Sequence, residues 1–183
     1  MKTDLILIGP IGTGKSTLGE LLAKKLGLAQ ISMDDVRFDY YQEIGYDPAL
    51  AEEKRKTNGI WGVYPYWKPF EAHAVERLLA DHQACVFDLG AGHSVYEDPA
   101  LFARVQKALV PYPNVILLLP SPDKDESIEI LNEREPFLRN TTPNINAHFI
   151  HHPSNETLAK IIIYTKNKTP EETCEEILHT ITP

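Results

Sequence analysis

The sequence predicts an α/β fold in which a five-stranded parallel sheet is covered by helices on both faces. Short apolar runs that suit buried strands alternate with longer segments whose apolar residues recur at helical spacing. This alternation is typical of strand–helix–strand units with parallel strands. A chain of 183 residues can form one domain with a substantial core, so we expect a single domain over residues 1–183.

The five expected strands are short and mostly apolar. They cover residues 5–8, 29–33, 84–87, 115–119 and 161–164. The helices expected between them cover residues 16–26, 49–56, 68–81, 99–109 and 123–134, together with a helix that follows Asp34-Asp35 and ends at Tyr41 or Glu43. Thr169-Pro170-Glu171-Glu172 is a capping box that predicts the start of a last helix.

Two segments have no clear period. Residues 60–67 combine four aromatic side chains with glycine and proline, and we expect a loop there that packs in the core or faces a substrate. Residues 135–155 are rich in Pro, Asn and polar residues with weak periodicity. This second segment is predicted to be a mobile lid.

A glycine-rich stretch lies between the first strand and the first helix. Gly9-Pro10-Ile11-Gly12-Thr13-Gly14-Lys15-Ser16 fits the phosphate-binding pattern G-x-x-x-x-G-K-[ST] at every fixed position. Glycine allows backbone N–H groups to approach a polyphosphate, and the helix N-terminus adds partial positive charge. Lys15 is expected to reach the β- and γ-phosphates, and the Ser16 hydroxyl to bind Mg²⁺. The expected nucleotide-binding residues of this stretch are Gly9, Gly12, Thr13, Gly14, Lys15, Ser16 and Thr17.

Acidic side chains follow the second and third strands. Asp34 could accept a proton from an attacking hydroxyl, or it could cap the next helix. Asp88 has the Walker-B position and could coordinate Mg²⁺, or it could be a turn aspartate. Arg134, at a helix end, could stabilise the transferring phosphoryl group, or it could simply be solvated. Because parallel strands end at one edge, the glycine-rich stretch, Asp34, Asp88 and the glycines after the third strand should share one crevice.

Composition limits the classes of partner. The net charge is −8 and no long basic run is present, which argues against nucleic acid. Cys85 and Cys174 lie in apolar patterns and are expected to be reduced thiols of a cytoplasmic protein. No apolar run approaches the length of a membrane span, and the first residues are too short and too acidic for a signal peptide.

On these residues the chain resembles the shikimate kinase group of small P-loop kinases, whose near relatives are gluconate and adenylylsulfate kinases. The similarity is strongest over residues 9–26 and extends to residues 163–172 and to the turn Gly90-Ala91-Gly92. It implies the three-layer P-loop NTPase fold, ATP and Mg²⁺ as cofactors, and a monomer or weak homodimer. It also implies that Lys166 and Asn167 belong to the loop around the nucleotide base.

The acceptor side departs from the family pattern at the second strand. Ser32-Met33-Asp34 stands where the family has an Asp-x-Asp pair. Asp34 takes the place of the aspartate that activates the acceptor, and Ser32 that of the metal-associated one. The metal therefore lacks a carboxylate unless Asp88 supplies it. Asp34-Asp35-Val36-Arg37 resembles a run of adenylylsulfate kinases, which implies that Arg37 contacts the substrate.

Two further departures concern the substrate carboxylate. In Trp67-Lys68-Pro69-Phe70-Glu71, Lys68 stands in place of the arginine that grips this group, and lysine cannot make the same bidentate fork. His151 is the counterpart of a second arginine in the lid. With Gly90 and Gly92, these residues are the expected substrate contacts.

The resemblance thus implies an ATP-dependent kinase that phosphorylates a hydroxyl of a small molecule. It weakens the case for shikimate itself and leaves open a less polar alcohol, such as an antibiotic or a nucleoside. Two alternatives remain at this point. One is a regulatory ATPase without a small acceptor, and the other is a non-catalytic relative that lost its metal carboxylate at Ser32.

Overall fold

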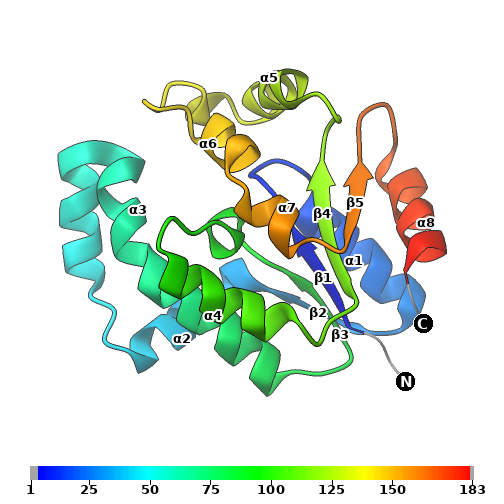
Figure 1. The fold of residues 1–183 in the computed structure, drawn as a ribbon, viewed down its shortest axis with the longest axis horizontal. Coiled ribbons are helices and arrows are strands. Elements are labelled where there is room, and N and C mark those ends of the chain that lie inside the picture. The colour runs from blue at the N-terminus through cyan, green and yellow to red at the C-terminus, as the bar shows by residue number, and fades with distance from the viewer. Residues whose placement is uncertain (1–3, 182–183) are drawn as a thin grey trace.

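The computed structural model describes residues 4–181. Its centre is a parallel sheet with the strand order β2-β3-β1-β4-β5 (Figure 1). The strands are β1 (Leu5–Ile8), β2 (Ala29–Ser32), β3 (Cys85–Asp88), β4 (Asn114–Leu119) and β5 (Ile161–Tyr164). The predicted five-stranded parallel sheet of the P-loop NTPase fold is therefore confirmed.

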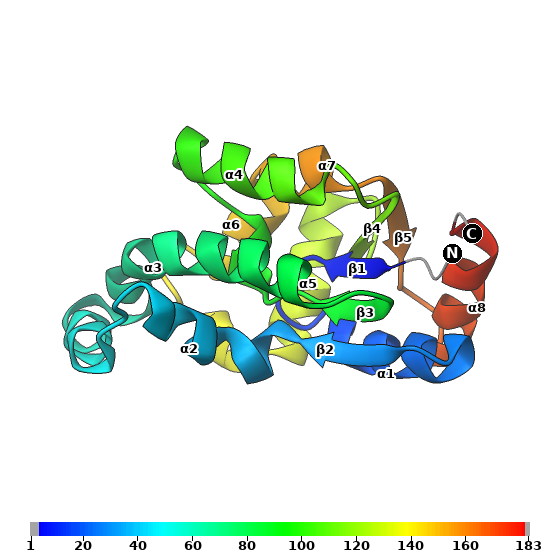
Figure 2. The same ribbon diagram turned by 90° about the horizontal axis from the view of Figure 1, so that it is seen from below.

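Helices cover both faces of this sheet, as the predicted three-layer fold requires (Figure 2). One face is covered by α1 (Lys15–Leu26) and α8 (Pro170–Thr180). The other carries α2 (Met33–Glu43), α3 (Pro48–Asp81), α4 (Pro99–Leu109) and α7 (Ser154–Leu158). Beyond the carboxyl ends of the strands lie α5 (Lys124–Arg134) and α6 (Ile145–His151). Two short 3₁₀ helices, η1 (Ala91–Ser94) and η2 (Pro136–Leu138), complete the described elements.

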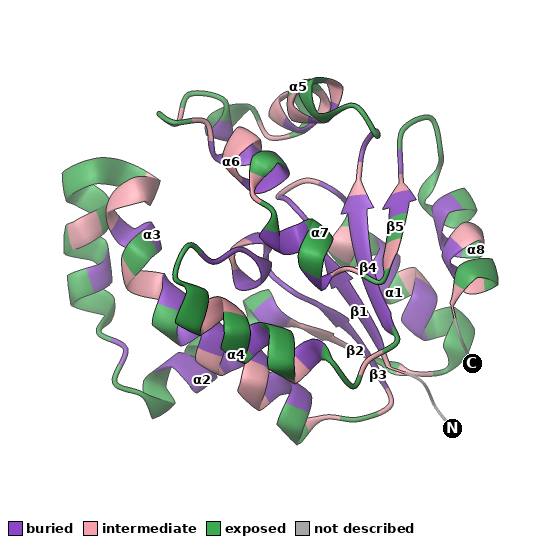
Figure 3. Ribbon diagram, in the orientation of Figure 1, coloured by how far each residue is buried: buried purple, intermediate pink, exposed green. Residues whose placement is uncertain are grey.

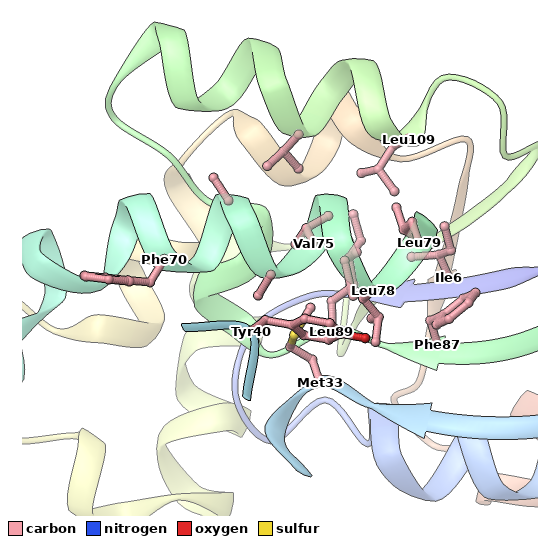
Figure 4. Packing of buried hydrophobic residues seen from close by; sticks show 14 of the residues in the cluster. Ile6, Met33, Tyr40, Phe70, Val75, Leu78, Leu79, Phe87, Leu89 and Leu109 are labelled. Atoms are coloured by element: carbon pink, nitrogen blue, oxygen red, sulfur yellow. The ribbon is translucent and has the colours of Figure 1, made fainter. Parts of the chain in front are cut away.

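The central strand β1 is buried on both faces because its side chains alternate between two cores (Figure 3). Leu5 and Leu7 pack in a cluster with residues of α1 and α8. Ile6 and Ile8 belong to a larger cluster with residues of α2, α3 and α4, part of which Figure 4 shows. The two cores hold the carboxyl end of β1, and with it the glycine-rich stretch, in a fixed place.

The prediction of a loop over residues 60–67 is wrong. These residues lie inside α3, which changes direction at Asn58 and Gly59, where the backbone leaves helical geometry (φ 57° at Gly59). After this kink the helix continues through Pro65 and Pro69. Its buried side chains pack into two of the molecule's apolar clusters, and this tertiary packing outweighs the low helix propensity of proline and glycine.

Other differences from the predicted elements are small. β2 ends at Ser32, because Met33 already begins α2. The Gly90-Ala91-Gly92 turn after β3 leads into η1, which begins at Ala91. The capping box of α8 is confirmed, since the Thr169 hydroxyl accepts from the Glu172 N–H and the Glu172 carboxylate accepts from the Thr169 N–H. Within residues 4–181, no helix has both the length and the apolar character needed to cross a bilayer.

Candidate active site

The glycine-rich stretch connects the end of β1 to the start of α1, and its backbone uses conformations that favour glycine. Gly9 has φ +137°, and a Cβ there would lie 2.5 Å from the Leu118 carbonyl oxygen of β4. Gly14 has φ +89°, and a Cβ there would meet no atom within 4 Å. The stretch is thus pressed against the sheet at Gly9 and open at Gly14, where α1 presents its N-terminal N–H groups.

Lys15 curls back over this stretch. Its Nζ donates hydrogen bonds to the carbonyl oxygens of Gly9 and Pro10, each at 2.8 Å. Burial lowers the pKa of Lys15 to about 8, while the carboxylates of Asp34 and Asp88 act in the opposite direction. The lysine is therefore held in the hollow of the loop by carbonyls that a phosphate group can replace as partners.

Asp88 is buried at the end of β3, and polar side chains surround its carboxylate. Oδ1 accepts from Ser32 Oγ at 2.9 Å and from Ser16 Oγ at 3.4 Å, and Oδ2 accepts from Gln30 Nε2 at 2.7 Å. Ser32 and Asp88 are direct partners in the β2–β3 ladder. A carboxylate beside the Ser16 hydroxyl is a donor set of hard oxygens, which fits Mg²⁺. No group of three or more His, Cys, Asp or Glu side chains that could hold a metal ion occurs within residues 4–181.

Asp34 stands in the first turn of α2, at the same edge of the sheet. Ser32 occupies the N-cap position of this helix, without a side-chain cap hydrogen bond, and Asp34 is the second residue of the helix, so N-capping does not account for Asp34. Its carboxylate is half exposed and forms an ion pair with Arg37, with Oδ1 and Nη1 2.9 Å apart. A Cβ on Gly90 would lie 3.0 Å from the same oxygen, so the carboxylate rests directly over the glycine turn after β3.

Three adjoining hollows surround these residues. The base-side hollow is bordered by Thr13, Thr17, Arg134, Thr165, Lys168 and Pro170. The loop hollow contains Lys15, Ser16, Asp88 and Glu135. The inner pocket, about 240 Å³, lies between the turn after β3, the kinked part of α3, and α6. Ile11, Asp34 and Ala91 line both the loop hollow and the inner pocket, so the two spaces meet at the Asp34 carboxylate.

Arg134, expected to act on the transferring phosphoryl group, donates to the Gly12 carbonyl at 3.0 Å and so lies against the glycine-rich stretch. Lys166 and Asn167, expected around the nucleotide base, lie farther out. Lys166 is exposed and paired with Glu126, and Asn167 is exposed with φ +59°. Neither of these two lines the base-side hollow, which their neighbours Thr165 and Lys168 border.

The resemblance implies that Lys68 contacts the substrate, but Lys68 does not line the inner pocket. It is buried, with its Nζ 2.5 Å from Glu71 Oε2. The same ammonium donates to the carbonyl oxygens of Gly92, at 2.8 Å, and Val95, at 3.0 Å. Lys68 therefore ties α3 to the glycine turn, while Glu71 is the charged residue of this pair that lines the pocket.

His151 also lies apart from the pocket. It is exposed near the end of α6, whereas Ile145 and Phe149 of the same helix line the pocket. The reason is helical geometry, because residues four apart share a face and His151 falls on another one. The other expected contacts, Arg37 and the turn glycines Gly90 and Gly92, do border the inner pocket.

Several pocket residues carry no clear signal in the sequence. For Tyr64 and Trp67 the sequence leaves open whether they pack in the core or face a substrate, and the structure places both at the pocket, on α3 and not in a loop. His93 lines it from η1, and its position directly after the Gly-Ala-Gly turn is the only local hint. These side chains can be assigned only when the packing of α3 against the turn is known.

No family model matches the chain. It is similar to the shikimate kinases of Streptomyces avermitilis (28% identical, covering 95% of this chain and 92% of the relative) and Streptomyces coelicolor (27% identical, covering 97% and 94%). Among solved structures it matches the shikimate kinase of Acinetobacter baumannii in complex with shikimate (TM-score 0.64, 20% identical, covering 97% and 91%). It also matches a gluconokinase of Sinorhizobium meliloti (TM-score 0.52, 14% identical, covering 97% and 90%). In sequence and fold, the chain is thus a shikimate kinase-like small P-loop protein.

Proposed function

We propose that the protein is an ATP-dependent kinase that transfers the γ-phosphoryl group of ATP to a hydroxyl of a small molecule. The observation that carries this proposal is the position of Asp34, which lines both the loop hollow and the inner pocket. A carboxylate between a phosphate-binding loop and a second, enclosed space is what phosphoryl transfer to an alcohol requires. The similarity to shikimate kinases over nearly the whole chain supports the same activity.

In this proposal the glycine-rich stretch and Lys15 bind the phosphates of ATP, and Arg134 approaches them from α5. The base occupies the base-side hollow beside Thr165 and Lys168. Ser16 and Asp88 would hold Mg²⁺, which supplies charge neutralisation on the phosphate oxygens. Ser32 and Gln30 orient the Asp88 carboxylate through the hydrogen bonds described above.

The acceptor lies in the inner pocket with its hydroxyl beside Asp34. The hydroxyl oxygen forms a bond to the γ-phosphorus while the bond from that phosphorus to the bridging oxygen breaks, so ADP leaves. The hydroxyl proton passes to the Asp34 carboxylate, which Arg37 holds in place.

We further propose that residues 135–155 act as a lid. Glu135 borders the loop hollow, and Leu138, Ile145 and Phe149 border the inner pocket. This segment therefore covers both spaces at once. Its closure over the bound substrates would exclude water and so limit the wasteful hydrolysis of ATP.

The test is ADP formation by the purified protein across a panel of alcohols that includes shikimate, gluconate, nucleosides and aminoglycosides. We expect one class to raise the rate well above background, and Asp34→Asn to lower this gain by about 100-fold or more, as for loss of a general base. Asp35→Asn is the matched control, because Asp35 is exposed and outside all three hollows. Fast hydrolysis that depends on Lys15 but on no alcohol would indicate a regulatory ATPase. Mg²⁺-independent ATP binding without turnover would indicate a non-catalytic relative.

A further inference from the structure

The inner pocket is lined by more carboxylates than cations. Among the described residues that line it, Arg37 is the one arginine or lysine; its Nη1 is paired with Asp34, and its Nε is buried without a hydrogen-bond partner. Glu71 adds a carboxylate whose partner, Lys68, also donates to the carbonyl oxygens of Gly92 and Val95. A carboxylate bound here would therefore lie beside two acidic groups and would have to share Arg37 with Asp34.

The remaining walls of the pocket are mostly apolar. They are formed by Ile11, Ile60, Trp67, Leu138, Ile145 and Phe149. These side chains come from the glycine-rich stretch, α3, η2 and α6, so they surround the pocket from several directions. Such a lining favours a ligand with a substantial apolar body.

Three buried polar atoms in this lining make no hydrogen bond within residues 4–181: His93 Nδ1, Arg37 Nε and Glu71 Oε2, of which the last is ion-paired with Lys68. His93 is 1% exposed, and its Nε2 lies 3.1 Å from the Tyr41 hydroxyl. Its Nδ1 makes no hydrogen bond to any described residue. A Cβ on Gly90 would lie 2.7 Å from this Nδ1 and 3.0 Å from Asp34 Oδ1, so the two atoms border the same glycine.

The charge state of His93 agrees with this arrangement. Burial shifts its pKa far below the ordinary value, although the Asp34 carboxylate acts in the opposite direction. The imidazole is therefore neutral at physiological pH and can exchange one hydrogen bond with a ligand, but it cannot neutralise an anion.

We propose that the inner pocket takes an uncharged acceptor, an alcohol with an apolar body and no carboxylate, and that a second polar group of this alcohol hydrogen-bonds to His93 Nδ1. This inference rests on the proposed kinase activity and specifies its substrate class. Under this proposal the chain differs from the similar shikimate kinases in the acceptor that it binds, whereas the residues around the phosphate groups are similar.

The first test uses pairs of alcohols that differ at one carboxyl group, which is charged in one member and uncharged in the other. Shikimate and its methyl ester form one such pair, and other hydroxy acids with their amides form further pairs. We expect the uncharged member to have at least a tenfold higher kcat/KM and a correspondingly lower Kd in the presence of a non-hydrolysable ATP analogue. An equal or higher kcat/KM for the acids refutes the inference and leaves the kinase activity standing. If the uncharged member binds but no alcohol is phosphorylated, the proposed kinase function is refuted instead.

The second test addresses His93 with two variants that each keep one half of the imidazole's hydrogen bonding. His93→Asn places an amide near the position of Nδ1, and His93→Gln places one near Nε2, where it can still reach Tyr41. We expect His93→Gln to raise the KM of the acceptor about tenfold, with the KM of ATP unchanged, and His93→Asn to have the smaller effect. Thermal melting confirms that both variants fold. Equal acceptor KM values in the two folded variants would rule out a contact through Nδ1.

Discussion

Replacing Lys68 with methionine distinguishes a structural role of this residue from a substrate contact. Lys68 and Glu71 are 5% and 4% exposed, and their charged atoms are 2.5 Å apart. Lys68→Met leaves the Glu71 carboxylate buried without its cation. It also removes the donor to the carbonyl oxygens of Gly92 and Val95. The structure therefore predicts a large loss of stability.

The magnitude follows from the burial of the pair. Removing one partner of a buried ion pair costs about 3–5 kcal/mol of unfolding free energy. In a chain of this size each kcal/mol lowers Tm by about 2–4 °C, so Tm should fall by roughly 6–20 °C. The double variant Lys68→Met/Glu71→Met removes the unpaired charge and should regain much of this loss.

The assay is urea unfolding of the wild type, the single and double variants, and Lys56→Met as a control. Lys56 lies on the same helix in an exposed pair with Glu52 (Nζ to Oε1 3.6 Å), so its replacement should change stability by less than about 1 kcal/mol. The reasoning is refuted if Lys68→Met also costs less than about 1 kcal/mol and instead raises the KM of the acceptor. That result would make Lys68 the substrate cation that the family resemblance implies.

Three further predictions concern the phosphate-binding side and the glycine turn. Because the pKa of Lys15 is lowered to about 8, the ammonium loses its charge above that pH, and the Kd of ATP should rise by up to tenfold per pH unit in titrations between about pH 6.5 and 9.5. Lys15→Arg keeps its charge over this range and should show no such rise. Asp88→Ser should lower Mg²⁺-dependent turnover by about 100-fold in Mg²⁺ titrations. The double variant Asp88→Ser/Ser32→Asp should regain part of this turnover, because the two positions are partners across the β2–β3 ladder. Gly92→Ala would place a Cβ 2.4 Å from Glu71 Oε1 and should cost about 1–3 kcal/mol in urea unfolding; an unchanged unfolding free energy would show that Glu71 can move away freely.

The features that the sequence predicts well are those fixed by local chemistry. The glycine-rich stretch, the strand before it and the helix after it follow from residue type and spacing within residues 5–26. The α8 capping box is equally local. Asp34 and Asp88 could be placed near each other because parallel strands end at the same edge of a sheet, and the structure does bring both into the loop hollow.

The features that could not be predicted depend on how distant segments pack. Gly62 and Pro65 indicate a loop by propensity, yet burial of their neighbours keeps the segment helical. Lys68 is equally suited to a substrate or to an internal partner, and only the close approach of Glu71 and the turn after β3 decides between them. The orientation of His93 requires knowledge of Tyr41, which is 52 residues away in the sequence.

The course of α3 after its kink bears on how such an enzyme can diversify. Ile60, Tyr64, Trp67 and Glu71 follow one another at intervals of four, three and four residues, and all four line the inner pocket. A single helical stripe therefore supplies one wall of the acceptor space, and none of its members borders the loop hollow. In the proposed kinase, substitutions along this stripe would change the acceptor without touching the residues proposed to hold phosphate. The determinants of acceptor choice and of phosphate binding would thus lie on different segments, and a small library at these positions would be a direct route to new acceptors.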